Sequence, residues 1–165
     1  MKHFILLLAI IALPVSCKNS DNLQVGDTPG ITGDEYIEVA DNIIYDVVIK
    51  VPNQDDPWEV EKLAGYRGDE MVNALFDAVY SGKVKVTDYH SGKNLSTKNL
   101  EKLEQEPGFE RENIGKIQFT EKWHFNRSSL EIEKEVISLV IGYENRDPAD
   151  GTLIGYIAAF KMDFR

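Results

Sequence analysis

Glu121 is the side chain of this sequence whose setting most suggests acid–base chemistry. Apolar and polar residues alternate around it, which places Glu121 on the same predicted strand face as Phe119 and Trp123. A carboxyl group held partly out of water can serve as a general acid in a cleft. The alternative is structural: Glu121 meets a basic residue across a hairpin, for example Lys134, or a sheet edge leaves it in water. Because no second group at a fixed offset completes an acid–base pair, the pattern favours the structural alternative.

Other sequence patterns that carry chemistry are missing. Besides His3, the histidines are His90 and His124, and neither has a second histidine at helical spacing. Zinc needs three or four ligands, and neither the glycine motifs that bind phosphate nor the Gly-x-Ser-x-Gly motif of hydrolases occurs. We therefore predict no metal, no cofactor and no enzymatic activity. The alternative function is binding or hydrolysis of a small extracellular ligand in a cleft near Glu121 and Tyr156.

The first residues predict export from the cytoplasm. Lys2 is followed by ten apolar residues, from Phe4 to Leu13, whereas a helix needs roughly 20 apolar residues to span a bilayer. A charged start, a short apolar run and small residues after it are typical of a signal peptide, here residues 1–16. The five residues that end in Cys17, Leu-Pro-Val-Ser-Cys, resemble the lipobox of bacterial lipoproteins.

Cys17 is the only cysteine of the chain, and acylation would give this unpaired thiol a role. We therefore expect cleavage before Cys17 and a lipid on its sulfur, which would anchor the protein in the cell envelope. The membrane would be the outer membrane or one that faces the periplasm. The alternative is cleavage beside Ser16 that leaves a free thiol.

The composition is acidic, with 28 acidic against 18 basic residues and a formal net charge of −10. Nucleic acids and anionic lipids attract basic surfaces, so we predict no binding of nucleic acid, and membrane attachment mostly through the lipid. Residues 17–35 are rich in Gly, Asp and Asn and have no apolar period. They predict a flexible tether that carries one domain, residues 36–165.

The first half of the domain predicts helices between strands. Alternating apolar residues over 43–51 indicate a strand, and a loop over 53–58 follows it. A helical apolar stripe then runs from Met71 to Val79, with Asp69 as the expected N-cap and Ser81-Gly82 as the end. A short strand over 83–89 and a second helix follow; Ser96 is the expected cap of this helix, which ends before Pro107.

The last third predicts three consecutive strands, over 117–125, 130–143 and 154–164, with a hairpin turn at 126–129 and a polar loop at 144–151. Short connections make such strands an antiparallel meander. The apolar phase changes near Lys134 to Val136, which predicts a bulge or an edge there. The predicted fold class is therefore α+β: an antiparallel sheet of about four to five strands that ends in this meander, with two or three helices on it.

Several short segments resemble a known family, GldN/PorN, whose members are subunits of the type IX secretion and gliding-motility machinery. Residues 71–88 are similar to its helix-then-strand unit, and Gly155-Tyr156 to its last strand. Residues 117–127 are similar to its strand pattern, with matches at the following positions: Glu121, Trp123, Phe125, Asn126 and Arg127. The resemblance implies work through protein contacts with an envelope partner. The residues that we expect at a partner surface, or as a buried acid, are Glu121, Trp123, Arg127 and Tyr156.

Overall fold

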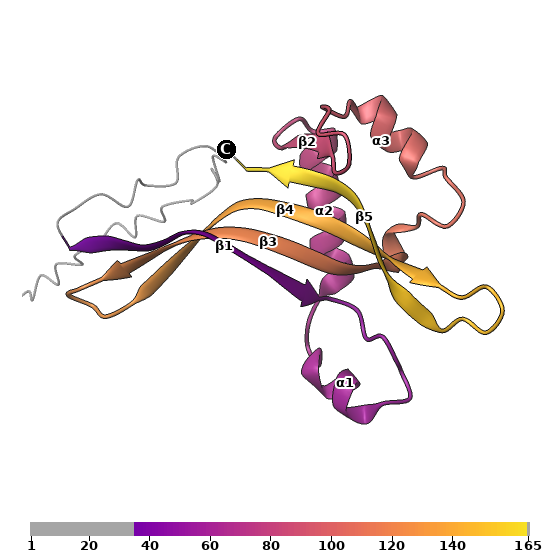
Figure 1. The fold of residues 1–165 in the computed structure, drawn as a ribbon, viewed down its shortest axis with the longest axis horizontal. Coiled ribbons are helices and arrows are strands. Elements are labelled where there is room, and N and C mark those ends of the chain that lie inside the picture. Colours follow the sequence, from indigo (N-terminus) through magenta and orange to yellow (C-terminus); the bar gives the residue numbers. More distant parts are fainter. Residues whose placement is uncertain (1–34, 165) are drawn as a thin grey trace, which may run out of the picture. The chain divides into compact units, whose positions relative to one another are not determined.

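Five antiparallel strands form one sheet in the order β1–β3–β4–β5–β2 in the computed structural model, which describes residues 35–164 (Figure 1). The strands are β1 (Tyr36–Val48), β2 (Lys85–Asp88), β3 (Ile114–Asn126), β4 (Ile132–Arg146) and β5 (Leu153–Asp163). The helices are α1 (Pro57–Lys62), α2 (Gly68–Tyr80) and α3 (Thr97–Leu103), with a 3-10 turn, η1, at Arg111–Asn113. The predicted α+β class and the C-terminal meander, β3–β4–β5, are confirmed.

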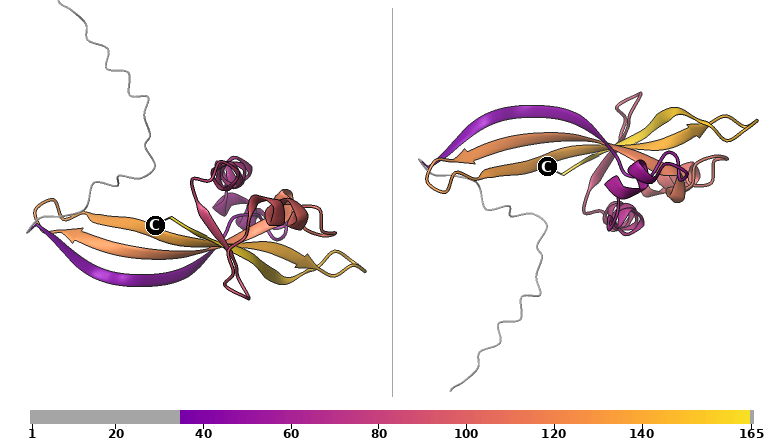
Figure 2. Two further views of the ribbon diagram at one scale, coloured as in Figure 1. Left: turned by 90° about the horizontal axis from the view of Figure 1, so that it is seen from above. Right: turned by 90° about the horizontal axis from the view of Figure 1, so that it is seen from below.

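The core lies between one face of the sheet and α2. Both α2 and α3 lie on the same side of the sheet (Figure 2). The stripe predicted for α2 is confirmed, because Val72, Phe76 and Val79 are buried. The ring of Phe76 is fully buried and meets Phe160 of β5 edge-on at 5.6 Å between centroids. Aromatic pairs in this geometry add to the burial of their apolar area, so this contact joins helix to sheet.

The helix ends confirm one predicted cap and overturn another. Ser96 caps α3 by accepting from the backbone N–H of Asn99, and the Asn99 side chain bonds back to Ser96. Asp69, the expected N-cap of α2, lies inside the helix, because α2 begins earlier, at Gly68, and the N-cap position is Arg67. Gly82 ends α2 as predicted, with a φ of 73° that glycine adopts without strain.

The sheet is longer than its helical cover. We call the part of β1, β3 and β4 beyond Thr120 the arm: residues 36–43, 121–126 and 132–137. The pairing of β5 with β4 ends at Ser138–Asp163, whereas β3 and β4 stay paired to Phe125–Ile132. In Figures 1 and 2 the helices lie over the other half of the sheet. No helix of the described residues therefore covers either face of the arm.

The bulge predicted near Lys134 to Val136 is confirmed at the base of the arm. Thr120 pairs with Ser138 but its neighbour Glu121 pairs with Val136, so Ile137 is the extra residue of β4. An extra residue in one strand shifts its side-chain alternation by one position. The change in apolar phase that the sequence shows has this physical cause.

Three predicted boundaries are wrong. The first strand was expected over 43–51, but β1 covers 36–48, because Glu38 and Asp41 are neutralised by Lys122 of β3 at 2.8 and 2.9 Å. The loop expected over 53–58 ends sooner, since Asp56 caps α1. Residues 144–146, expected in a loop, continue β4.

Residues 1–16 and Cys17, the expected signal peptide and lipidation site, lie outside the described residues, as does most of the expected tether. No helix within residues 35–164 is long and apolar enough to cross a bilayer.

Candidate functional site

Aromatic side chains from two strands gather on one face of the arm and of the strand pair at its base. Tyr45 of β1 stacks on Phe119 of β3 at 5.5 Å between ring centroids, with 15° between the ring planes. Alternation along β3 places Trp123 and Phe125 on the same face as Phe119. Both of these rings are half-buried. We call this surface the aromatic face; its residues are Tyr45, Phe119, Glu121, Trp123, Phe125 and Lys134.

Glu121 lies buried within the aromatic face, with 4% of its surface exposed. The hydroxyl of Tyr45 donates to one carboxylate oxygen at 2.8 Å, and the indole Nε1 of Trp123 donates to the other at 2.8 Å. Burial and the bond to Glu121 raise the pKa of Tyr45, so its hydroxyl stays a donor at neutral pH. The carboxylate therefore fixes the positions of the two rings that flank it.

Lys134 pairs with Trp123 across the hairpin and lies over its ring, with Nζ 4.3 Å from the ring centroid and 6.0 Å from that of Tyr45. The prediction that Glu121 meets Lys134 across the hairpin is therefore wrong in its chemistry, because the ammonium faces aromatic rings. Within residues 35–164, no basic side chain comes within 4.0 Å of the Glu121 carboxylate. Its hydrogen bonds come from neutral donors.

The other two predicted site residues lie elsewhere. Arg127 is exposed in the hairpin turn at the end of the arm, where its backbone N–H donates to the carbonyl of Glu35 at 2.8 Å. Tyr156 of β5 lines a hollow of about 420 Å³ on the opposite side of the sheet, beside Lys116. Glu121 is not among the residues that line this hollow. The structure thus brings Glu121 and Trp123 together and places Tyr156 at a separate site.

Sequence reasoning missed a buried charge cluster next to Tyr156. The Glu144 side chain is 1% exposed and accepts from Lys50 at 2.9 Å and from Arg146 at 2.9 and 3.0 Å. Burial alone would raise the pKa of Glu144, but the bonds from Arg146 and Lys50 outweigh it and lower the pKa. The alternation Gly142, Glu144, Arg146 in the sequence was the signal, and the loop prediction for residues 144–151 hid it.

Tyr156 and Glu144 pack closely because position 115 has no side chain. A Cβ on Gly115 would lie 2.7 Å from Cε1 of Tyr156 and 3.0 Å from Cγ of Glu144. The buried Tyr156 hydroxyl has no hydrogen-bond partner among residues 35–164. Burial and the nearby Glu144 carboxylate raise the pKa of Tyr156. This corner of the sheet is close-packed and charged, and Tyr156 lines the hollow whereas Glu144 does not.

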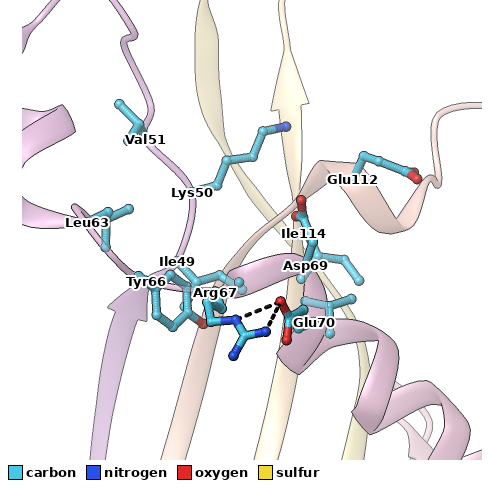
Figure 3. Close-up of a pocket in the computed structure, with 12 residues that line it drawn as sticks. Ile49, Lys50, Val51, Leu63, Tyr66, Arg67, Asp69, Glu70, Glu112 and Ile114 are labelled. Atoms are coloured by element: carbon cyan, nitrogen blue, oxygen red, sulfur yellow. Dashed lines mark hydrogen bonds and ion pairs between the residues drawn. The ribbon is translucent and has the colours of Figure 1, made fainter.

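A larger cavity, of about 610 Å³, opens between the end of β1 and the start of α2 (Figure 3). Its apolar lining includes Ile49, Leu63 and Ile114. Two of its charged residues, Arg67 and Glu70, form an exposed ion pair at 2.5 Å, drawn with dashed lines in the figure. No group of three side chains able to hold a metal ion is found among residues 35–164.

The Glu144 cluster gives a pH-dependent prediction. Because its pKa is lower in the folded chain than the ordinary value of 4.5, the ionised carboxylate stabilises the fold at neutral pH, and this is lost as pH falls below about 4.5. We expect Glu144→Gln to lower the free energy of unfolding by about 2 kcal/mol at pH 7 and by much less at pH 3. Urea unfolding at both pH values measures this difference.

The matched control is Glu70→Gln, since this carboxylate is 62% exposed in its pair with Arg67. Its removal should change stability by about 0.5 kcal/mol or less. A loss for Glu144→Gln that is equal at pH 7 and pH 3 would contradict the assignment of an ionised, stabilising carboxylate.

No protein-family model matches the chain, and no curated protein matches it. The likeness of residues 71–88 and 117–127 to the GldN/PorN family therefore stays a prediction. The geometry has to be interpreted from the residues themselves.

Proposed function

We propose that this chain is a lipid-anchored protein of the cell envelope that works by binding another protein through the aromatic face of its arm. The observation that carries the proposal is that half-buried aromatic rings stand in register on a part of the sheet that no described helix covers. Tryptophan and tyrosine are enriched among the residues that carry binding energy at protein interfaces. Rings with fixed positions lose little conformational freedom on binding.

The properties of the opposite face of the arm support the aromatic face as the binding surface. It is polar, and its charges are matched within the arm: Lys122 bonds Glu38 and Asp41, and the Tyr36 hydroxyl donates to Glu133 at 2.6 Å. Exposed, internally paired charges are compatible with permanent contact with water. The arm therefore has one solvent face and one face suited to a partner.

The anchor and the cellular role rest on the sequence. A lipid on Cys17 would hold the domain at a membrane, and a coil of the length of residues 18–35 spans about 25 Å on average, enough to lift the domain off the headgroups. The resemblance to GldN/PorN supports a place beside the type IX secretion and gliding-motility machinery. No observation favours the alternative of a ligand cleft shared by Glu121 and Tyr156, and it is not carried further.

The lipid anchor is tested by Cys17→Ser in the expressing cell. We expect the wild-type chain in the membrane fraction, with an acylated Cys17 as the first residue of the mature protein by mass spectrometry. The variant should lack the lipid and lose most of its membrane association, because a hydroxyl cannot take the thioether-linked lipid. Equal, unprocessed membrane fractionation of both proteins would refute the anchor.

The binding surface is tested by affinity capture from crosslinked envelopes with surface variants. Phe125→Ser removes a ring of the aromatic face that makes no hydrogen bond to Glu121, so the rest of the face should stay in place. We expect recovery of the partner to fall about tenfold, the usual scale for an interface aromatic. Ile154→Ser is the control, because Ile154 is 64% exposed at the start of β5, outside the arm.

Partner recovery that is equal for Phe125→Ser and the wild type would exclude the aromatic face. A chain recovered only as a monomer, with no crosslinked partner, would count against the binding function itself.

A further inference from the structure

We propose that the aromatic face receives an arginine side chain of the partner, which takes the place of Lys134 over Trp123 and pairs with the carboxylate of Glu121. This inference rests on the proposed function, since it names the chemistry of the partner that the arm would bind. The site consists of four side chains of the aromatic face: Tyr45, Glu121, Trp123 and Lys134.

The first observation concerns the hydrogen bonds and ion pairs of Glu121. Its side chain is buried, and its hydrogen bonds come from a phenol and an indole, two neutral donors. A buried carboxylate is stabilised most by a cation, and a carboxylate accepts about four hydrogen bonds, of which two are made here. Glu121 therefore keeps acceptor capacity and lacks an ion-pair partner within residues 35–164.

The second step is the aromatic environment of the carboxylate. Trp123 and Tyr45 both direct their polar edges at Glu121, and Trp123 offers its ring face to a cation, as the position of Lys134 shows at 4.3 Å. Tryptophan is the ring that attracts cations most strongly. A guanidinium group stacks on such a ring with its plane and reaches a carboxylate with its edge, two contacts that an ammonium group cannot make together as well.

The third step is the occupant. Lys134 is exposed, and among the described residues its ammonium makes contacts with rings but no ion pair. An exposed lysine held only by cation–π contacts is bound weakly, so a partner's cation can displace it. The chain carries a net charge of −10, which attracts a basic partner over longer distances. Lys134 thus marks the position of the incoming cation and competes with it.

The chain contains a second lysine–tryptophan pair that serves as an internal control. Lys62 lies 5.8 Å from the ring centroid of Trp58, within α1, and Trp58 is 66% exposed. No hydrogen bond joins the Trp58 ring to a carboxylate within residues 35–164. The proposal predicts arginine binding at Trp123 and not at Trp58.

The test is a fluorescence titration of the purified full chain with acetyl-arginine amide at constant ionic strength. The chain has two tryptophans, so Trp58→Phe leaves Trp123 as the reporter and Trp123→Phe leaves Trp58. In the Trp58→Phe background, we expect a saturable change in emission that is about five- to tenfold tighter for Lys134→Met, because the competing cation is gone. Acetyl-citrulline amide, which is neutral and of similar shape, should give no saturable change.

Glu121→Gln should abolish the tighter binding, since an amide removes the anionic partner of the guanidinium; circular dichroism checks that this variant is folded. Should it fail to fold, Lys134→Met, a change at an exposed position, decides alone through the comparison of arginine with citrulline. Binding no tighter for Lys134→Met than for Lys134, equal responses to both probes, or equal responses of Trp123 and Trp58 would each overturn the proposal.

The titration needs no partner, so its outcome is separate from that of the envelope capture. Captured partner with no arginine binding at Trp123 would refute this inference and leave the binding function standing. Arginine binding at Trp123 without a captured partner would support the arginine site and count against the binding function.

Discussion

β3 is hydrogen-bonded along its length to β1 on one side and to β4 on the other, and it extends past the layer of helices. Because of this difference in length, one part of the sheet packs against helices and the other part does not. Under the helices, the same face of β3 buries Ile117 completely in an apolar core. Beyond them, no helix among residues 35–164 covers this face.

In this uncovered part of the sheet, the hydrogen bonds from Tyr45 and Trp123 to Glu121 hold the side chains in place. A hydrogen bond to a charged group contributes about 1.5–3 kcal/mol, more than one between neutral groups. The bond from Tyr45 joins β1 to β3, and the bond from Trp123 lies within β3. They also fix two large rings at the surface. The stability of the arm and its readiness to bind a partner therefore have one origin, the buried carboxylate of Glu121. The partner chemistry inferred above follows from the same carboxylate.

The periodicity of the sequence predicted those features that depend on contacts between residues close together in the chain. The apolar stripe of α2, the Ser96 cap and the phase change at Ile137 all lie within one turn or one strand, so the sequence shows them directly. The start of β1 was missed because its acids look like loop residues until Lys122 of β3 is placed beside them. That pairing joins residues some 80 positions apart, which no local pattern can reveal.

The candidate site shows the same division. Alternation put Glu121 and Trp123 on one face, and that part was predictable. Tyr45, which donates a hydrogen bond to Glu121, lies 76 residues away in the sequence. The reason why Glu121 can be buried was therefore not predictable. Glu144 was hidden for a similar reason, since its partner Lys50 lies 94 residues away. Contacts between distant strands decide the chemistry of both acids.

The central claim is that the Trp123 indole is held by the Glu121 carboxylate, and hydrogen exchange of the two indole N–H groups tests it most directly. The chain has two tryptophans, so two indole resonances are expected in a proton–nitrogen NMR spectrum. The account predicts slow exchange for the Trp123 indole, fast exchange for that of Trp58, which is 66% exposed, and loss of the difference in Glu121→Gln. Equally fast exchange of both indoles in the wild-type chain would contradict it.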